Sequence, residues 1–398
     1  MPHPHMRITR RSALLGLATA CTLGRSSLAL AAAPTEHRLV IVLLRGAMDG
    51  MAAVIPYGDP DLAALRPGLT GAPPGQPGGV LDLGGFFGLH PALTGLHGLY
   101  AANEMLAVHA IAGPYRTRSH FDAQDCMESG AERRLASGWL NRAVAAMPGR
   151  PAGALAVGVQ IPLLLRGTAN VGTYAPPSAA TPAPELLARI ADLMHLDPLL
   201  GPAVAEGLRD RGFSTATLAG MDKPPGNSGS GPGAFASLAG AAGKLLAASD
   251  GPRIAAMEVG GWDTHAGQAG RLQAPLRALD AGLLALRDGL GSAWRQTAVL
   301  VMTEFGRTAR VNGTGGTDHG TGGAAFLLGG AVAGGRVLAD WPGLGAGKLF
   351  EDRDLQPTCD LRALSAGLLS GHLGVPPAAL AGVFPGAAVA PMAGLLRA

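Results

Sequence analysis

Apolar and polar residues alternate in blocks along this chain, and the blocks predict strands that alternate with helices. Five short apolar runs without polar alternation are typical of strands that are covered on both faces. The runs cover residues 39–44, 105–111, 253–259, 297–302 and 324–330. Apolar residues recur at helical spacing at 185–196 and 271–290, which predicts amphipathic helices between strands. This order predicts an α/β layered fold with a mainly parallel sheet.

Glycine and proline interrupt the pattern most clearly at residues 222–233, which read DKPPGNSGSGPG. This segment is the best candidate for a linker, and it is equally compatible with a surface loop inside one domain. The 398 residues suffice for one large domain or two ordinary ones. We predict a single domain over residues 34–398 with a Pro/Gly-rich loop near 222–233.

Residues 1–33 have the pattern of an export signal. Arg10 and Arg11 precede a short apolar stretch and then small-residue cleavage candidates, which predicts a twin-arginine signal peptide. The alternative is an ordinary basic region of a secretory signal. No other segment reaches the roughly 18 apolar residues of a membrane span. We therefore expect a periplasmic or secreted protein that does not span the membrane after the signal is removed.

Charge and cysteine content narrow the classes of function. The formal net charge is only +3, and no Lys/Arg cluster is interleaved with aromatic residues, so nucleic acid is not an expected partner. Cys126 and Cys359 follow the signal and form no metal-binding pair in the sequence. Export would permit a bridge between them, and two free thiols are equally compatible with the sequence.

Polar and charged side chains gather just after the predicted strands, while the strands themselves carry almost no charge. Because ligands of open α/β sheets bind beyond the carboxyl ends of the strands, we expect these side chains to meet in one crevice. The candidates are Arg45, Asp49, Thr117, Arg118, Ser119, His120, Asp263, His265, Glu304, Arg307, Asp318 and His319.

Carboxylates and imidazoles in this mixture predict one or two divalent metal ions, with Zn preferred and Mn, Fe or Ca as alternatives. A bound cation would relieve the repulsion among clustered acids. The candidate metal ligands are Asp49, Asp263, His265, Glu304, Asp318, His319 and His120. Arg45, Arg118 and Arg307 are candidates to hold an anionic oxygen. A metal could also activate the hydroxyl of Ser119 or Thr117 as a nucleophile.

Structural roles without chemistry remain open for the same residues. Asp49 precedes a glycine and could form a turn. Asp263 and His265 could begin a helix, and Glu304 could pair with Arg307 at another helix start. The glycine-flanked loop that holds Asp318 and His319 could be a simple turn.

Several long motifs resemble one family. The segments are LRGAMDGMAAVIPYGDPDLAALRPGL, TRSHFDAQDCMESG, VGGWDTH, TEFGRTARVNGTGGTDHG and GGRVLADWPGL. Their order and wording resemble the exported bacterial family called domain of unknown function 1501, over about residues 38–385. That family is similar to the alkaline phosphatase and sulfatase superfamily. The resemblance implies a three-layer α/β/α fold with a central mixed, mostly parallel sheet and a metal site at the strand ends.

The superfamily's site holds two metals around a Ser or Thr nucleophile, and the resemblance assigns roles by position. Asp49 matches the acid after the first strand, and Ser119 is the preferred match to the nucleophile, with Thr117 second. Asp263 and His265 resemble the acid–histidine pair of one metal site, and His319 resembles its later histidine.

The chain departs from the superfamily at the second metal. Glu304 and Phe305 stand where an Asp and a His are common, and a Phe cannot bind a metal. His120 and Asp318 are the candidates to compensate for the missing ligand.

The resemblance and the residues together predict an exported metal-dependent hydrolase of phosphate or sulfate esters with a Ser or Thr nucleophile. Its partner would be a small anionic ester or a sulfated or phosphorylated glycan. The alternative is a non-catalytic metal-binding envelope protein that binds anionic glycans or assembles with partners.

Overall fold

The computed structural model describes residues 35–148, 153–175, 184–198, 200–219 and 232–397. The predicted signal peptide at 1–33 and most of the predicted loop at 222–233 lie outside the described residues. In the part that is described, no helix combines the length and the apolar character that crossing a membrane would require.

A nine-stranded sheet forms the centre of the fold, in the order β11-β5-β10-β9-β1-β8-β6-β7 with β12 paired to β5. Every described pair in it is parallel except the two made by β10. The prediction of a mixed, mostly parallel sheet is thus confirmed. The strands are β1 Arg38–Arg45, β5 Met105–Ala112, β6 Ala154–Val157, β7 Val171–Tyr174, β8 Ile254–Gly260, β9 Thr297–Thr303, β10 Gly323–Leu328, β11 Arg336–Leu338 and β12 Cys359–Asp360.

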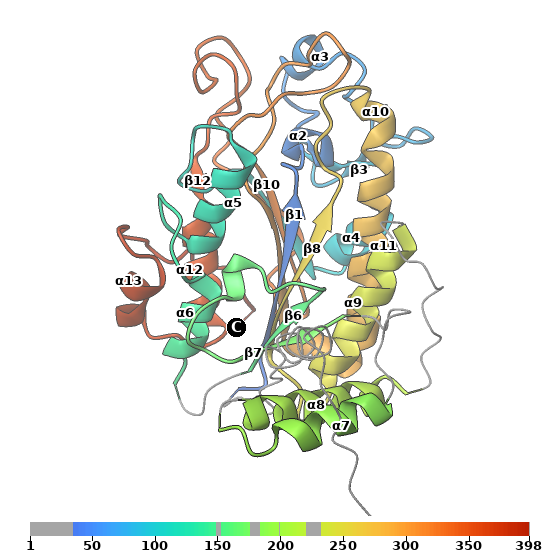
Figure 1. The fold of residues 1–398 in the computed structure, drawn as a ribbon. Helices are drawn as coiled ribbons and strands as arrows, with labels where there is room; N and C mark the ends of the chain where they lie inside the picture. Colours follow the sequence, from blue (N-terminus) through green and yellow to red (C-terminus); the bar gives the residue numbers. More distant parts are fainter. Residues whose placement is uncertain (1–34, 149–152, 176–183, 199, 220–231, 398) are drawn as a thin grey trace, which may run out of the picture.

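Helices cover both faces of the sheet, which gives three layers (Figure 1). One face carries α4 Thr94–Ala101, α9 Pro232–Ala247 and α11 Gln273–Leu290, and the other carries α5 His120–Ser129, α6 Trp139–Ala146, α12 Leu361–Gly371 and α13 Leu380–Val383. Successive residues of β1 point to opposite faces: Val40 and Val42 belong to one apolar core, and Leu39 and Ile41 to the other. This two-sided burial explains the continuous apolar runs.

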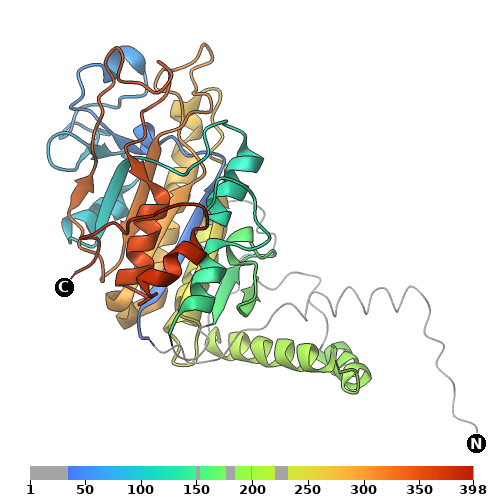
Figure 2. The ribbon, with the colours of Figure 1, turned by 90° about the vertical axis from the view of Figure 1, so that its left-hand side faces the viewer.

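The remaining elements lie around these layers. A small sheet of β2 Val54–Ile55, β4 Gly88–Leu89 and β3 Leu81–Asp82 follows the short helix α2 Gly50–Ala53, and α3 Leu62–Leu65 lies nearby. The helices α7 Pro184–Met194 and α8 Leu200–Thr217 project from the end of the molecule opposite α5 and α10, as Figure 2 shows. The short helix α10 Gln268–Arg271 precedes α11. Three 3₁₀ turns complete the described elements: η1 Leu163–Leu165, η2 Gly291–Gln296 and η3 Pro377–Ala379.

The predicted strands are all present, and the prediction was weakest for short or polar segments. Helix α5 was not expected, because its sequence HFDAQDCMES lacks a clear apolar stripe. Residues 154–167 form only one strand, β6, followed by the turn η1. The thiols of Cys126 and Cys359 are both free, which decides between the two alternatives for them.

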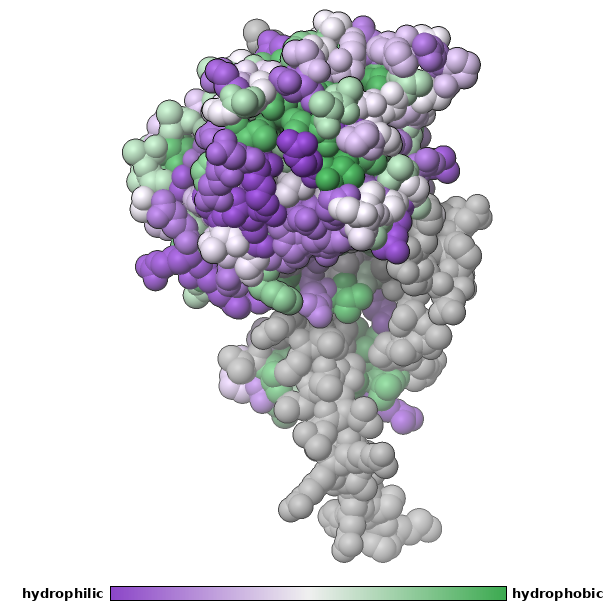
Figure 3. All heavy atoms as spheres, turned by 90° about the horizontal axis from the view of Figure 1, so that it is seen from above, coloured by the Kyte–Doolittle hydropathy of each residue, from purple (hydrophilic) through white to green (hydrophobic). Residues whose placement is uncertain are grey.

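The direction of the strands brings the candidate residues to one edge. Strands β1, β5, β8 and β9 end at the upper edge of the sheet in Figure 1, and the antiparallel β10 begins there. Seen from above that edge, hydrophilic residues gather on the surface beside apolar ones (Figure 3).

Candidate metal centre

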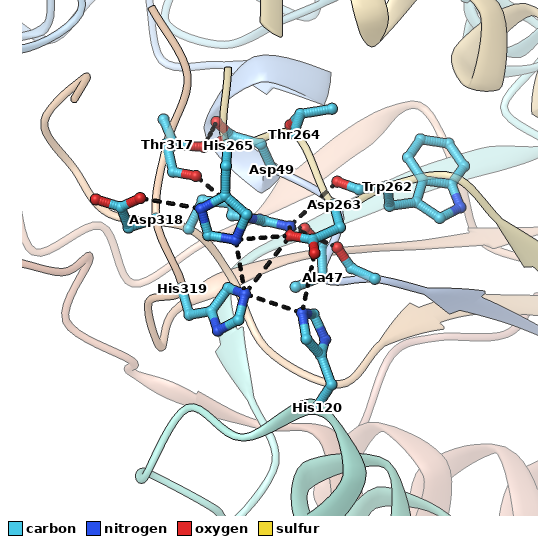
Figure 4. A network of polar contacts seen from close by, with 12 residues as sticks. Ala47, Asp49, His120, Trp262, Asp263, Thr264, His265, Thr317, Asp318 and His319 are labelled. Carbon is cyan, nitrogen blue, oxygen red and sulfur yellow. Dashed lines mark hydrogen bonds and ion pairs between the residues drawn. The ribbon is translucent and has the colours of Figure 1, made fainter. Parts of the chain in front are cut away.

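Three histidines and one aspartate converge at this edge from three separate loops (Figure 4). His120 opens α5, Asp263 and His265 follow β8, and His319 precedes β10. The Nε2 atom of His319 lies 2.9 Å from the Nε2 atoms of both His120 and His265. The carboxylate of Asp263 lies 3.0 Å from His265 Nε2, 3.5 Å from His319 Nε2 and 3.7 Å from His120 Nε2.

The ligand atoms of His120, Asp263 and His319 all lie within 4.8 Å of one another, which fits the ligands of one metal ion, and His265 adjoins Asp263 and His319. With metal–nitrogen bonds of about 2.1 Å, two tetrahedral ligand atoms lie about 3.4 Å apart. Five of the six pairs among the four side chains lie 2.9 to 3.7 Å apart, on either side of that value, and His120 with His265 is the pair outside this range. Three imidazoles with one carboxylate are a donor set that suits Zn²⁺ and related transition metals.

The opposite nitrogen of each ring decides how the three imidazoles can act. The Nδ1 atom of His120 lies 2.8 Å from the Glu304 carboxylate, and that of His265 lies 3.0 Å from the Asp318 carboxylate. The Nδ1 atom of His319 lies 3.0 Å from the backbone carbonyl of Arg118. Because these partners only accept, each Nδ1 carries the hydrogen, and each Nε2 lone pair faces the common centre. Lone pairs facing one another repel unless a cation or a proton lies between them.

The backbone at Arg118 is part of this arrangement. Arg118 has a φ of 65°, in the left-handed region that residues with a side chain rarely occupy. Its carbonyl is the acceptor for the ring of His319. Strained residues of this kind persist where the surrounding structure requires them, often at functional sites.

Arg307 links the loop after β1 to the loops that carry Asp263 and His319. Its guanidinium is buried and donates to the carbonyls of Gly46, Ala47 and Thr317 and to the carboxylate of Asp263. Gly46 has a φ of +117°, and a Cβ there would lie 2.9 Å from the backbone nitrogen of Asp263. The loop after β1 therefore passes too close to the loop after β8 for any other residue.

Asp49 lies in a buried network beneath the centre and not among the converging side chains. Both of its oxygens accept from Arg66, at 2.7 and 2.9 Å, and one also accepts from Gln268 at 2.6 Å. The carbonyl oxygen of Gln268 accepts from the hydroxyls of Thr264 and Thr317, which are close in sequence to the candidate ligands. This network sets the relative position of two ligand loops, and it leaves Asp49 no free oxygen for a metal.

Glu304 supports a ligand, and the geometry leaves it no free position as one. Its Oε1 accepts from the backbone of Gly46 and from Gln124, besides His120, and its Oε2 faces the hydroxyl of Thr303 at 2.8 Å. The ring of Phe305 packs against the rings of His120 and His319, with centroids 4.9 and 5.3 Å away. An apolar ring thus packs against two of the converging imidazoles and offers no ligand atom.

The three arginines that were expected to hold an anion are engaged elsewhere. Arg45 pairs with Glu128 at 2.7 Å and with Glu258. Arg118 pairs with Asp354 at 2.8 Å and with Glu351, and Arg307 is buried in the contacts described above. None of these three guanidinium groups has its paired N–H donors free to bind a substrate anion in this arrangement.

The hydroxyl groups of Ser119 and Thr117, the candidate nucleophiles, are uncommitted. Ser119 is the N-cap residue of α5, directly before His120, and its side chain makes no cap hydrogen bond. Thr117 is exposed. Within the described residues neither hydroxyl has a hydrogen-bond partner, so either is available to a ligand.

The carboxyl groups of the site are held in their charged form. Burial raises the pKa of Asp263, but the hydrogen bond and charge of Arg307 outweigh it, and the net pKa lies below the usual value. Burial likewise raises the pKa of Glu304, and the hydrogen bonds of His120 and Gln124 lower it further than burial raises it. The hydrogen bond of His265 is the main cause that lowers the pKa of Asp318.

The imidazole of His319 is held in its neutral form. Burial, followed by the charge of His120, lowers its pKa. Nearly half of the side-chain surface of both Asp263 and His265 is exposed, at 46% and 44%. The centre is therefore electron-rich and open to solvent, as a site that admits a ligand must be.

Sequence reasoning missed the residues that position the ligands. Arg66, Gln268, Thr264 and Thr317 carry the buried network, and Gln124 supports Glu304. Thr264 and Thr317 lie inside the quoted motifs, and this position was a weak indication that they belong to the site. Arg66 also lies inside a quoted motif, at the end of α3, whereas Gln268 begins α10 outside those motifs, and nothing in the local pattern distinguishes it.

Several solved structures are weakly similar to this chain. The structure of Ps i-CgsB in complex with k-i-k-neocarrahexaose is 9% identical over 86% of this chain and 73% of that chain, with a TM-score of 0.41. A mutant of TAB5 alkaline phosphatase with Mg bound in its M3 site is 10% identical over 73% of this chain and 90% of that chain, with a TM-score of 0.35. A protein of the alkaline phosphatase superfamily from Vibrio parahaemolyticus is 11% identical over 83% of this chain and 72% of that chain, with a TM-score of 0.32.

At these scores the likenesses carry no conclusion about this protein. No curated protein sequence matches the chain. Residues 102–383, by contrast, match a family described as "Protein of unknown function (DUF1501)", and they include every candidate metal ligand except Asp49. Since this match spans more than half of the 398 residues, the chain belongs to the DUF1501 family.

Proposed function

We propose that this protein is an exported, metal-dependent hydrolase of phosphate or sulfate esters whose centre holds one divalent ion, preferably Zn²⁺. The observation that carries the proposal is the convergence of three imidazole Nε2 atoms whose Nδ1 atoms are all tied to acceptors. His120, His265, His319 and Asp263 would hold the ion. Asp318 and Glu304 would orient the rings and raise their basicity.

The chain's own residues fit an attack on an anionic ester. A bound divalent ion supplies positive charge that attracts an ester anion and lowers the pKa of a neighbouring hydroxyl or water. Ser119 precedes the ligand His120 and has an uncommitted side chain, so it is the preferred nucleophile, with Thr117 second. Because the nearby arginines are paired, the substrate anion would be bound mainly by the metal.

The decisive experiment compares metal content and turnover in matched variants of the full chain. We expect about one metal ion per chain, and metal-dependent cleavage of aryl phosphate or sulfate esters. His265→Ala should lose the metal, and Ser119→Ala should keep the metal and lose turnover. Ser129→Ala is the matched control, because Ser129 lies at the far end of the same helix. A protein that is purified without bound metal and takes up none would refute the proposal.

The alternative is a metal-binding envelope protein that grips an anionic glycan without cleaving it. One observation favours it specifically: the presence of Phe305 in place of a second ligand. Metal binding without turnover on any phosphate or sulfate ester, together with glycan binding that Ser119→Ala leaves unchanged, would favour this role.

The exported location is part of the proposal and has its own test. Residues 1–33 fused to a reporter should send it to the periplasm or the medium by the twin-arginine route. Replacement of both Arg10 and Arg11 by Lys should abolish that export. Export that persists in the double variant would indicate the general secretory route. The remaining residues, 34–398, would form the mature single domain.

A further inference from the structure

A second cavity, of about 400 Å³, lies beside the buried network and contains none of the candidate metal ligands. Its walls come from α2, from the Pro/Gly loop at 68–78, and from α10 and α11, which lie in the upper part of Figure 1. The volume falls within the range of ordinary small-molecule sites. The apolar part of the wall includes Ile55, Leu69 and Leu272.

The polar groups of this cavity are mostly hydrogen-bond donors, and no carboxylate lines it. Arg277 donates to Gln273 at 2.9 Å and forms no ion pair with a described acid, so most of its donors remain available. The Nδ1 atom of His90 accepts from the backbone of Ala92 at 3.1 Å, which places the ring hydrogen on Nε2. Among the described residues, that Nε2–H has no acceptor.

The protonation of His90 agrees with this assignment. Burial, followed by the charge of Arg277, lowers the pKa of His90, so the ring is neutral near pH 7. A neutral ring with Nδ1 as acceptor is a pure donor on its other side. A positive guanidinium and a neutral N–H donor therefore face the same space.

We propose that this cavity binds a small organic oxyanion, such as a carboxylate or a phosphate ester, with the oxyanion on Arg277 and His90. The apolar body of the ligand would pack against Leu69 and Leu272. A charged acceptor would satisfy the donors of both Arg277 and His90. The apolar wall favours a ligand with an apolar body over a bare, fully hydrated ion. The proposal does not depend on ester hydrolysis at the metal centre.

Gln268 links this cavity to the metal centre. It lines the cavity, is fully buried, and accepts from Thr264 and Thr317 in the two ligand loops. A ligand that packs against Gln268 restrains both loops, and the ligand and the metal then favour each other's binding. By thermodynamic linkage the effect is reciprocal.

Calorimetric titration of the full, metal-loaded chain tests the proposal, with benzoate and phenylphosphonate as probes and benzamide as the neutral isostere of benzoate. Benzoate should bind at least about tenfold more tightly than benzamide, since a charge-assisted hydrogen bond contributes at least this factor. Arg277→Ala should weaken the binding of both anions by about tenfold or more. Ala269→Trp, at an exposed position in the wall, should block it. Both variants should keep the wild-type metal content.

Arg287→Ala is the matched control, because it removes the same charge from the same helix, α11, outside the cavity. Anion binding that survives Arg277→Ala and Ala269→Trp would place the probe on the metal and overturn the proposal. An equal loss in Arg287→Ala would indicate general attraction to positive charge, and no binding at millimolar concentration would also overturn it.

The link to the metal has a separate readout. Saturating benzoate should tighten the metal Kd of the wild type, measured by competition with a chelator, and leave that of Arg277→Ala unchanged. An equal effect of benzoate on the metal Kd of both proteins would show that Gln268 does not couple the cavity to the metal centre. A failure of ester hydrolysis would leave each of these measurements intact.

Discussion

The carboxylate of Glu304 offers the sharpest test of the proposed metal centre, because it would act on a bound metal only through His120. Its pKa is held below the usual value by hydrogen bonds that outweigh its burial, so the side chain is charged at neutral pH. Glu304→Gln removes that charge and keeps the size of the side chain. The new amide oxygen can accept from Gly46, His120 and Gln124, and the new amide nitrogen can donate to the hydroxyl of Thr303.

The magnitude follows from the contact with His120 at 2.8 Å. A hydrogen bond to a charged partner contributes about 1.5–3 kcal/mol, and a neutral one about 0.5–1.5 kcal/mol. The loss of about 1–2 kcal/mol corresponds to a metal Kd that is about 5- to 30-fold weaker. Outer partners of metal-bound histidines usually have effects of about 10- to 100-fold, which agrees with this range.

The assay is competition with a chromophoric chelator, combined with thermal unfolding of the metal-free protein. Glu258→Gln is the control, because Glu258 lies at the same edge of the sheet and pairs with Arg45 instead of a histidine. We expect metal-free Glu304→Gln to unfold close to the wild-type temperature. A folded Glu304→Gln protein whose metal Kd lies within about twofold of the wild type would refute the assignment of Nδ1 partners.

Three further predictions concern the scaffold of the site. Arg307→Lys keeps the charge but cannot reproduce a fork of donors to several carbonyls, so we expect a lower melting temperature and weaker metal binding in the same two assays. Arg66→Ala leaves Asp49 charged and buried without its partner, which should cost about 3–5 kcal/mol in urea unfolding, and an unchanged midpoint would contradict the role of the pair. His109 is fully buried, and burial lowers its pKa to about 4. Because the unfolded state then binds more protons, stability should fall by about 3 kcal/mol as pH decreases from 7 to 4, and His109→Gln should lack this component when both are unfolded in urea at each pH.

Much of the fold could be predicted because the strands are buried on both faces. Burial in a parallel sheet demands continuous apolar runs, and those of β1, β8 and β9 are visible without any structure. Polar helices lack such a signal, and α5 was missed although it carries His120. Most of the candidate ligands could be named for the same reason, since polar residues that follow apolar strands must lie at the sheet's edge.

The roles within the site could not be predicted, because they depend on which hydrogen-bond partners each side chain has in the folded protein. Asp49 and Glu304 resemble ligands in sequence, yet Arg66 and His120 occupy their oxygens. The arginines 45, 118 and 307 resemble anion-binding groups, yet each is paired with an acid that is distant in the sequence.

The sequence by itself determined the layered α/β class, the edge at which the polar residues meet and the family to which the chain belongs. These features follow from local patterns of burial and from motifs that are continuous in the chain. Only the tertiary structure brings His120, His265, His319 and Asp263 close to one another and gives the other acids different partners. The reason is physical: a lone pair becomes a ligand only when its ring is held by a partner on its far side, and that partner comes from elsewhere in the fold.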